Sequence, residues 1–95
     1  MPLTLPNDWA PRPYQTALWE YLAAGEKERA VWLVSDSVLG AINRGQGQAL
    51  RQVLESFRAP DIAPADWIRV NLARGEIYSY LRELPLARAS YEAAL

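Results

Sequence analysis

The side chains that could act as nucleophiles lie in one short polar run, Ser35, Asp36 and Ser37. A serine attacks a substrate when a neighbouring base takes its proton, and that base is most often a histidine or a lysine. The chain has no histidine and no cysteine, and its single lysine, Lys27, lies upstream in a charged turn. We therefore interpret the three residues as polar positions on a helix surface, and we expect no catalytic residue.

Groups that would hold a cofactor or a metal ion are also missing from the sequence. Zinc sites are built mainly from cysteine and histidine, and no cluster of carboxylates suggests a hard metal ion. Gly45-Gln46-Gly47 precedes a predicted helix, as a phosphate-binding loop does, but Leu50 stands where the third glycine is required. We interpret these glycines as a turn between helices, and we expect no cofactor.

Three arginines recur at intervals of seven residues, at Arg44, Arg51 and Arg58. Because seven residues are close to two helical turns, the three side chains would form one stripe across a helix. A solvated basic face is one interpretation, and a docking site for an acidic partner is the alternative. The formal net charge is −1, so general attraction to nucleic acid or to an acidic membrane is not expected.

Length and composition limit the fold that must position these groups. A chain of 95 residues forms one domain, residues 1–95, and its 51% hydrophobic content is typical of an ordered globular protein. Met1-Pro2-Leu3-Thr4 lacks the pattern of a signal peptide, and no apolar run is long enough to cross a membrane. We therefore expect a cytoplasmic protein that does not bind membranes.

Prolines and hydrophobic spacing divide the first part of the chain. Four of the seven prolines lie in residues 1–13, which we predict to form an extended arm pinned by Trp9. Apolar residues at helical spacing predict three helices within residues 14–58, covering about 14–24, 29–43 and 46–57. The run 30–34 is apolar on all sides and would also suit a buried strand. A helix is favoured there, because helical spacing continues through Val38 and Ile42.

A proline-rich break at residues 59–64 separates these helices from a C-terminal hairpin, residues 64–95. Pro64 opens a helix that runs to about Glu83, and Pro85 starts a last helix. The predicted fold is therefore all-α, a small bundle of about five helices in antiparallel hairpins.

The C-terminal segment resembles a tetratricopeptide repeat, a helix pair with small and aromatic residues at fixed offsets. The matching positions are Gly75, Tyr78, Leu81, Leu84, Ala87, Tyr91, Ala94 and Leu95. Asn71, Arg74 and Arg82 stand where the family usually has tryptophan, leucine and the turn glycine. An ordinary helical hairpin with this spacing is the alternative, and residues 29–57 are repeat-like only.

The resemblance implies a role in protein binding, because residues of a repeat's first helix contact the ligand in this family. The corresponding positions are Arg69, Leu72, Glu76, Ser79 and Tyr80. Only Arg69 among them is basic, so the family's clamp for a peptide carboxylate is not reproduced. The resemblance also predicts that Tyr78 and Tyr91 are buried against Gly75 and Ala87.

Residues 5–30 resemble a different family, the N-terminal segment of phage terminase large subunits. The shared sequence is Trp9-Ala10-Pro11-Arg12-Pro13-Tyr14-Gln15, followed by an amphipathic helix. In related ATPases the glutamine can contact adenine, and a glycine-rich loop ending in Gly-Lys follows. That loop is missing, so we expect no nucleotide hydrolysis and interpret Gln15 as a residue of the helix start.

Our leading hypothesis is a non-catalytic helical module that binds a protein partner. The alternatives are a non-hydrolysing fragment of a DNA-packaging protein, a phage-type accessory protein such as an inhibitor of a host defence system, or an artificial or computationally generated chimera. Because the last helix of the best repeat lacks a cap, we also expect a homodimer or an obligate partner. Folding of the arm over that helix, through Leu3, Leu5 and Trp9, is the monomeric alternative.

Overall fold

The computed structural model describes residues 9–95, and all regular structure in this part of the chain is helical. The elements are α1 (Arg12–Ala23), α2 (Lys27–Asp36), α3 (Val38–Asn43), α4 (Gly47–Glu55), a short 3-10 turn η1 (Ala59–Asp61), α5 (Pro64–Tyr80) and α6 (Leu84–Ala94). The all-α prediction is therefore confirmed. None of these helices has the length and apolar character that crossing a membrane requires.

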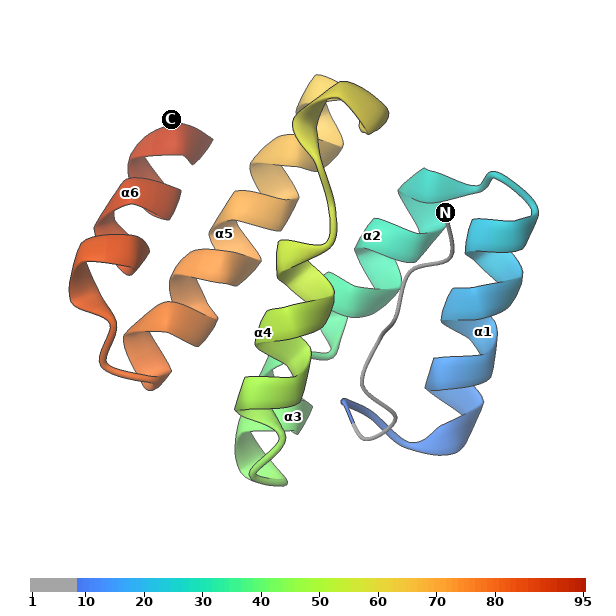
Figure 1. The fold of residues 1–95 in the computed structure, drawn as a ribbon, viewed down its shortest axis with the longest axis horizontal. Helices are drawn as coiled ribbons and strands as arrows, with labels where there is room; N and C mark the ends of the chain where they lie inside the picture. The colour runs from blue at the N-terminus through green and yellow to red at the C-terminus, as the bar shows by residue number, and fades with distance from the viewer. Residues whose placement is uncertain (1–8) are drawn as a thin grey trace.

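Helix α5 lies at the centre of the arrangement. It packs against α2, α3 and α4 on one side and against α6 on the other, while α1 packs against α2. Figure 1 shows the consequence: α1 and α6 lie at opposite ends of the molecule, with α4 and α5 between them. Two successive helical hairpins, α2/α3 with α4 and α5 with α6, therefore stack through α5.

Left-handed residues end three of the helices in the same way. Gly25 and Gly45 have φ angles of 75° and 72°, and the N–H of the next residue donates to a carbonyl five positions back. Arg82 takes the same conformation, with φ 65°, and Glu83 N–H donates to Tyr78 O at 2.9 Å. Glycine adopts this backbone without steric cost, whereas arginine pays about 1 kcal/mol or more. The turn is thus the type that glycine favours, with an arginine in its place.

Residues 30–34 lie inside α2, so the helical alternative is confirmed over the strand. The predicted single helix over 29–43 is wrong, because the chain breaks at Ser37 into α2 and α3. Ser37 Oγ donates to Leu33 O at 2.8 Å, and Ser37 N–H donates to Val34 O, which tightens the last turn of α2. A hydroxyl that bonds back to the preceding turn bends a helix. Residues 9–95 therefore form six α-helices where about five helices were expected.

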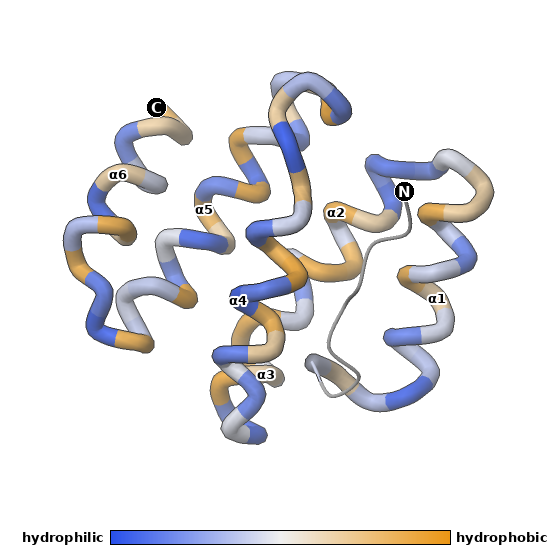
Figure 2. The backbone as a smooth tube through the Cα atoms, viewed as in Figure 1, coloured by the Kyte–Doolittle hydropathy of each residue, from blue (hydrophilic) through white to orange (hydrophobic). Residues whose placement is uncertain are grey.

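The core lies between α1, α2, α4 and α5. Its largest fully buried side chains include Trp9, Leu18, Leu50, Leu54 and Ile77, and Figure 2 shows hydrophobic and hydrophilic residues interleaving along the helices that contribute them. Trp9 is 1% exposed and packs in this core directly before α1. Residues 1–8 of the predicted arm lie outside the described residues, so its role in pinning the arm stays a prediction. Helix α1 begins at Arg12, within the predicted arm.

No residue of α6 belongs to the core cluster that contains Trp9. Trp9 therefore does not cover α6, and that part of the monomeric alternative is wrong. Leu3 and Leu5, the other residues assigned to that role, lie outside the described residues.

The two tyrosines of the predicted hairpin behave differently. Tyr78 is 6% exposed, as predicted. Tyr91 is 39% exposed, so its predicted burial is wrong. Its ring nevertheless lies on Gly75, where an added Cβ would come within 2.5 Å of the ring. Tyr91 therefore packs with one face on α5, while its other side is open to solvent.

Candidate functional site

A groove of about 360 Å³ runs between the end of α2 and the first four turns of α5. It is lined by Ser35, Asp36, Ala65, Ile68, Arg69, Leu72, Ala73 and Glu76. Three of the five contact positions predicted from the repeat resemblance, Arg69, Leu72 and Glu76, are among them. These residues share one face of α5 because they are spaced three and four apart.

Arg69 is held in place by two residues of α2. Its guanidinium lies 3.3 Å from the centroid of the Trp32 ring, and one of its nitrogens lies 4.0 Å from Asp36 Oδ1. Stacking on an aromatic ring and pairing with a carboxylate both favour a fixed orientation of the planar guanidinium. The floor of the groove therefore carries a positioned positive charge.

Large hydrophobic side chains are exposed around this charge. Trp32, Ile68 and Leu72 each leave close to half of their surface open to solvent. Single exposed hydrophobic residues are common, but a group gathered around one groove is a typical feature of interaction surfaces.

The polar groups of the groove leave an excess of negative charge. Asp36 pairs with Arg69, whereas Glu76 forms no ion pair with any described residue. Ser35 Oγ is buried at the groove wall and has no hydrogen-bond partner among those residues. A ligand in the groove therefore meets the carboxylate of Glu76, which has no ion-pair partner among the described residues.

Ser79 and Tyr80, the other two predicted contact residues, do not line the groove. The Tyr80 ring lies over Gly47 at the start of α4, where an added Cβ would be 3.2 Å from the ring. Trp32 was not predicted from the sequence, and Ser35 and Asp36 were expected only as polar positions on a helix surface. Placing the two hairpins side by side would have brought the end of α2 to the predicted face of α5.

The predicted arginine stripe is not one face of a helix. Of its three members only Arg51 lies within α4, since Arg44 ends α3 and Arg58 follows α4. Arg44 Nε donates to Gln46 Oε1 at 2.7 Å, and Arg51 pairs with two carboxylates. The stripe is interrupted because the α3–α4 turn and the end of α4 break the helical register.

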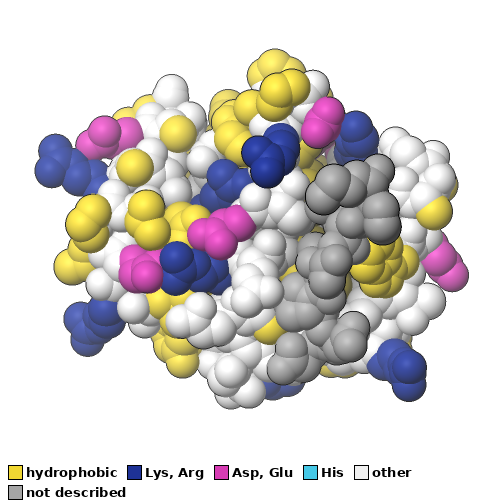
Figure 3. All heavy atoms as spheres, in the orientation of Figure 1, with side chains coloured by type: hydrophobic (Ala, Val, Ile, Leu, Met, Phe, Trp, Pro, Cys, Tyr) yellow, Lys and Arg dark blue, Asp and Glu magenta, His cyan; other side chains and the backbone are white. Residues whose placement is uncertain are grey.

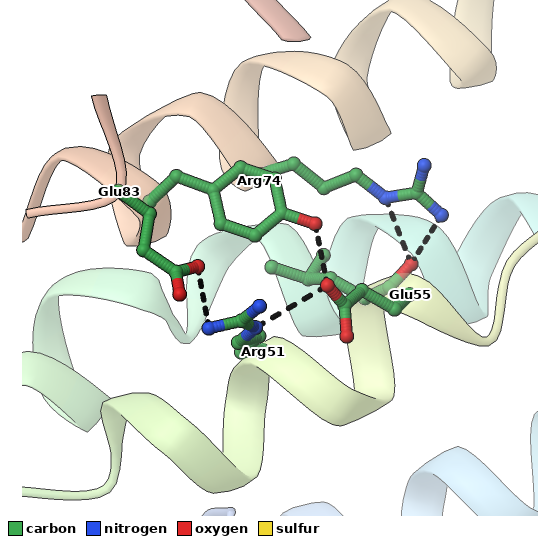
Figure 4. A network of polar contacts seen from close by, with 6 residues as sticks. Arg51, Glu55, Arg74 and Glu83 are labelled. Atoms are coloured by element: carbon green, nitrogen blue, oxygen red, sulfur yellow. Dashed lines mark hydrogen bonds and ion pairs between the residues drawn. The ribbon is translucent and has the colours of Figure 1, made fainter. Parts of the chain in front are cut away.

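Arg51 is the centre of a polar network that joins α4 to the α5–α6 hairpin (Figure 4). It lies 2.5 Å from Glu83 and 3.3 Å from Glu55, and its guanidinium is 5.4 Å from the Tyr78 ring centroid. Tyr78 OH donates to Glu55 at 2.6 Å. The network therefore spans α4, α5 and the turn before α6.

Burial and the neighbouring carboxylate change the acidity of this network. Burial, followed by the hydrogen bond to Glu55, raises the pKa of Tyr78 to about 12. The hydrogen bond to Glu83 raises the pKa of Arg51 above its ordinary value. Tyr78 therefore remains a neutral donor and Arg51 a cation near neutral pH, which suits a structural contact.

The side chain of Arg74, on α5, forms hydrogen bonds at the C-terminal end of α4. Its guanidinium donates to Leu54 O at 2.7 and 3.1 Å and to Phe57 O at 2.7 Å, and it lies 5.0 Å from the Trp67 ring centroid. Both carbonyls lie at or just beyond the C-terminal end of α4, where the helix dipole favours a cation. Leu54 O also accepts from Phe57 N–H at 3.3 Å. Burial lowers the pKa of Arg74 from its ordinary value. The same helix that lines the groove is thus fixed to α4.

The remaining motifs take structural positions. Gln15 Nε2 donates to Ala10 O at 2.6 Å, which confirms its interpretation as a residue of the helix start. Gly45 forms the turn before α4, and Gly47 is buried under Tyr80, which confirms the turn between helices. Within residues 9–95 no group of three or more potential ligands could hold a metal ion.

Comparison with known proteins gives no relative: no family model matches the chain, and no curated protein or solved structure is similar to it.

Proposed function

We propose that this chain is a non-catalytic helical module that binds another protein through the α2–α5 groove. The observation that carries the proposal is Arg69, which is held between Trp32 and Asp36 in a groove flanked by exposed Ile68 and Leu72. A partner that binds here can bury apolar surface against Ile68 and Leu72, and the fixed charge of Arg69 can orient it.

The architecture around the groove supports a repeat-like mode of binding. The groove lies between the first helices of two stacked hairpins, which is where the resemblance to tetratricopeptide repeats places a ligand. The left-handed backbone of Arg82, where that family has glycine, and the close approach of Tyr91 to Gly75 agree with the same register.

The chemistry of the groove favours one class of ligand. Ile68 and Leu72 would contact an apolar side chain, and the free carboxylate of Glu76 would attract a basic residue next to it. Because Arg69 already pairs with Asp36, an acidic segment has less to gain. The ligand is therefore a short protein segment that combines apolar and basic residues.

A displayed library of random peptides, selected against the whole chain, tests this proposal. We expect the selected peptides to be enriched in an apolar residue close to lysine or arginine. Their affinity for a Leu72→Glu variant should fall at least about tenfold, since the change places a charge where an apolar contact is needed.

Leu39→Glu is the matched control, because Leu39 is 69% exposed on α3 and does not line the groove. It should bind the selected peptides as the parent does. Equal losses in both variants, or selection of acidic peptides, would contradict the proposed site.

A further inference from the structure

The outer face of α6 is a second surface that differs from the groove. Helix α6 has α5 as its main neighbour, and Ala87 and Ser90 are buried on the side that faces α5. The opposite side carries a shallow groove lined by Leu84, Pro85, Arg88, Ala89 and Glu92. In Figure 3, hydrophobic, basic and acidic side chains lie next to one another over this end of the molecule.

Leucines are exposed at both ends of α6. Leu84 is 59% exposed and Leu86 44% exposed at its start, and Leu95 is fully exposed at its end. The ends of the helix are therefore apolar, while charged residues occupy its middle.

The charged residues are Arg88 and Glu92, which lie one turn apart. Their side chains are 84% and 62% exposed and form a pair with a 2.8 Å contact. An exposed pair of this kind contributes little to the stability of a single helix. Arg88 lies two residues before Ser90, and Glu92 lies two residues after it. An antiparallel second copy of α6 can therefore place its Glu92 opposite Arg88 and its Arg88 opposite Glu92, so the face is complementary to itself.

We propose that this face binds a second copy of the chain in a symmetric antiparallel pair of α6 helices. A two-fold axis at the level of Ser90 brings Arg88 against Glu92 of the second copy, and Pro85 against Leu95 of the second copy. Each contact occurs twice, because the same patch is used on both copies. The proposal does not depend on the function of the α2–α5 groove.

The dimer is weak and depends on concentration. A helix of 11 residues is only about 16 Å long, so one helix pair buries less surface than the roughly 1,200 Å² of stable complexes. Charge complementarity then decides whether the two copies associate, because like charges placed face to face oppose binding strongly.

Charge reversal combined with sedimentation equilibrium tests the proposal. The parent chain should change from monomer to dimer between about 10 μM and 1 mM, which corresponds to a weak association. Arg88→Glu and Glu92→Arg should each weaken dimerisation by about tenfold or more. An equimolar mixture of the two variants should dimerise as the parent does, because every charge then meets its opposite across the axis.

Arg29→Glu is the control, because it breaks an exposed ion pair far from α6, between Arg29 of α2 and Glu26 just before that helix. It should leave dimerisation unchanged, and circular dichroism should give the same helix content for all variants. A parent that stays monomeric up to 1 mM would overturn the proposal. So would single reversals that still dimerise, or a mixture that fails to restore the dimer.

Discussion

The two sides of α5 are built differently. On one side its Val70, Ala73 and Ile77 enter a continuous core that extends to Trp9. On the other side α6 contributes no residue to that core and is held by close approach, with Tyr91 lying on Gly75. The comparison indicates that the groove rests on the rigid side of α5, while α6 is the part of the fold that is easiest to separate.

The polar network marks the boundary between these two regions. Arg74 and Tyr78 lie on α5 and reach carbonyl and carboxylate groups of α4, and Glu83 reaches Arg51 from the turn before α6. Loss of these contacts should therefore weaken the packing of the α5–α6 hairpin on α4, while the hydrophobic core remains in place.

The largest effect is expected from the core itself. Trp9→Ala should reduce the free energy of unfolding by about 3–5 kcal/mol, as truncation of a fully buried aromatic residue typically does. Trp19→Ala is the matched control, because Trp19 is 45% exposed and should cost far less. Urea unfolding followed by circular dichroism measures both, and similar costs would mean that Trp9 does not belong to the core.

Arg74→Ala should cost about 3 kcal/mol, because Leu54 O and Phe57 O lose a charged donor in a partly buried place. Arg29→Ala, which removes an exposed arginine, should change stability by less than about 0.5 kcal/mol. Urea unfolding of the two variants checks this difference. A cost for Arg74→Ala no larger than that of the control would show that the end of α4 needs no partner from α5.

The next effect in size is expected from alkaline pH, which should weaken the polar network around Tyr78. Since the pKa of Tyr78 is raised from 10 to about 12, the protonated form favours the folded state. Its contribution is complete below pH 10 and is lost as the pH rises from 10 to 12, with a total of about 3 kcal/mol. Thermal unfolding between pH 8 and 12 should show a steeper loss for the parent than for Tyr78→Phe. Parallel curves would contradict the buried hydrogen bond to Glu55.

Gly75→Ala tests the close approach of α6. With Tyr91 present it should cost about 1 kcal/mol, because the new Cβ meets the ring and must displace it. In a Tyr91→Ala background the same change should stabilise the chain by up to about 1 kcal/mol, since alanine is the better helix former. Equal effects in both backgrounds, measured by urea unfolding, would mean that the two residues do not touch.

The smallest effect is expected at the turn that joins the two helices of the hairpin. Arg82→Gly should stabilise the fold by about 0.5–1 kcal/mol, because glycine adopts φ 65° without steric cost. Arg82→Ala keeps the Cβ and should bring no such gain. A gain of the same size from alanine would point to a repulsive charge, not to backbone strain, and the melting temperatures of the two variants distinguish these causes.

Local patterns in the sequence predict most of the helices but not the break at Ser37. Val31, Val34 and Val38 keep helical spacing through the break, and neither proline nor glycine interrupts them. What ends α2 is the bond from Ser37 Oγ to Leu33 O, which competes with a straight helix that the sequence allows equally well.

The candidate site was only partly predictable for a related reason. Spacing on a single helix placed Arg69, Leu72 and Glu76 on one face, and these three line the groove. Trp32 and Asp36 reach the groove through the packing of α2 on α5, and Arg74 reaches α4 across 20 residues of sequence. Contacts between helices depend on tertiary packing, which periodicity along one helix does not specify.

The most direct test of the proposed binding site is site-specific photocrosslinking from within the groove. A photoreactive phenylalanine at position 72 should form discrete adducts with a partner protein in a cell lysate, and Arg69→Glu in the same chain should weaken them. The same group at position 39, which is more accessible but lies outside the groove, should form none of these adducts. Adducts of equal intensity from both positions, or none from position 72, would contradict the α2–α5 groove as the site of binding.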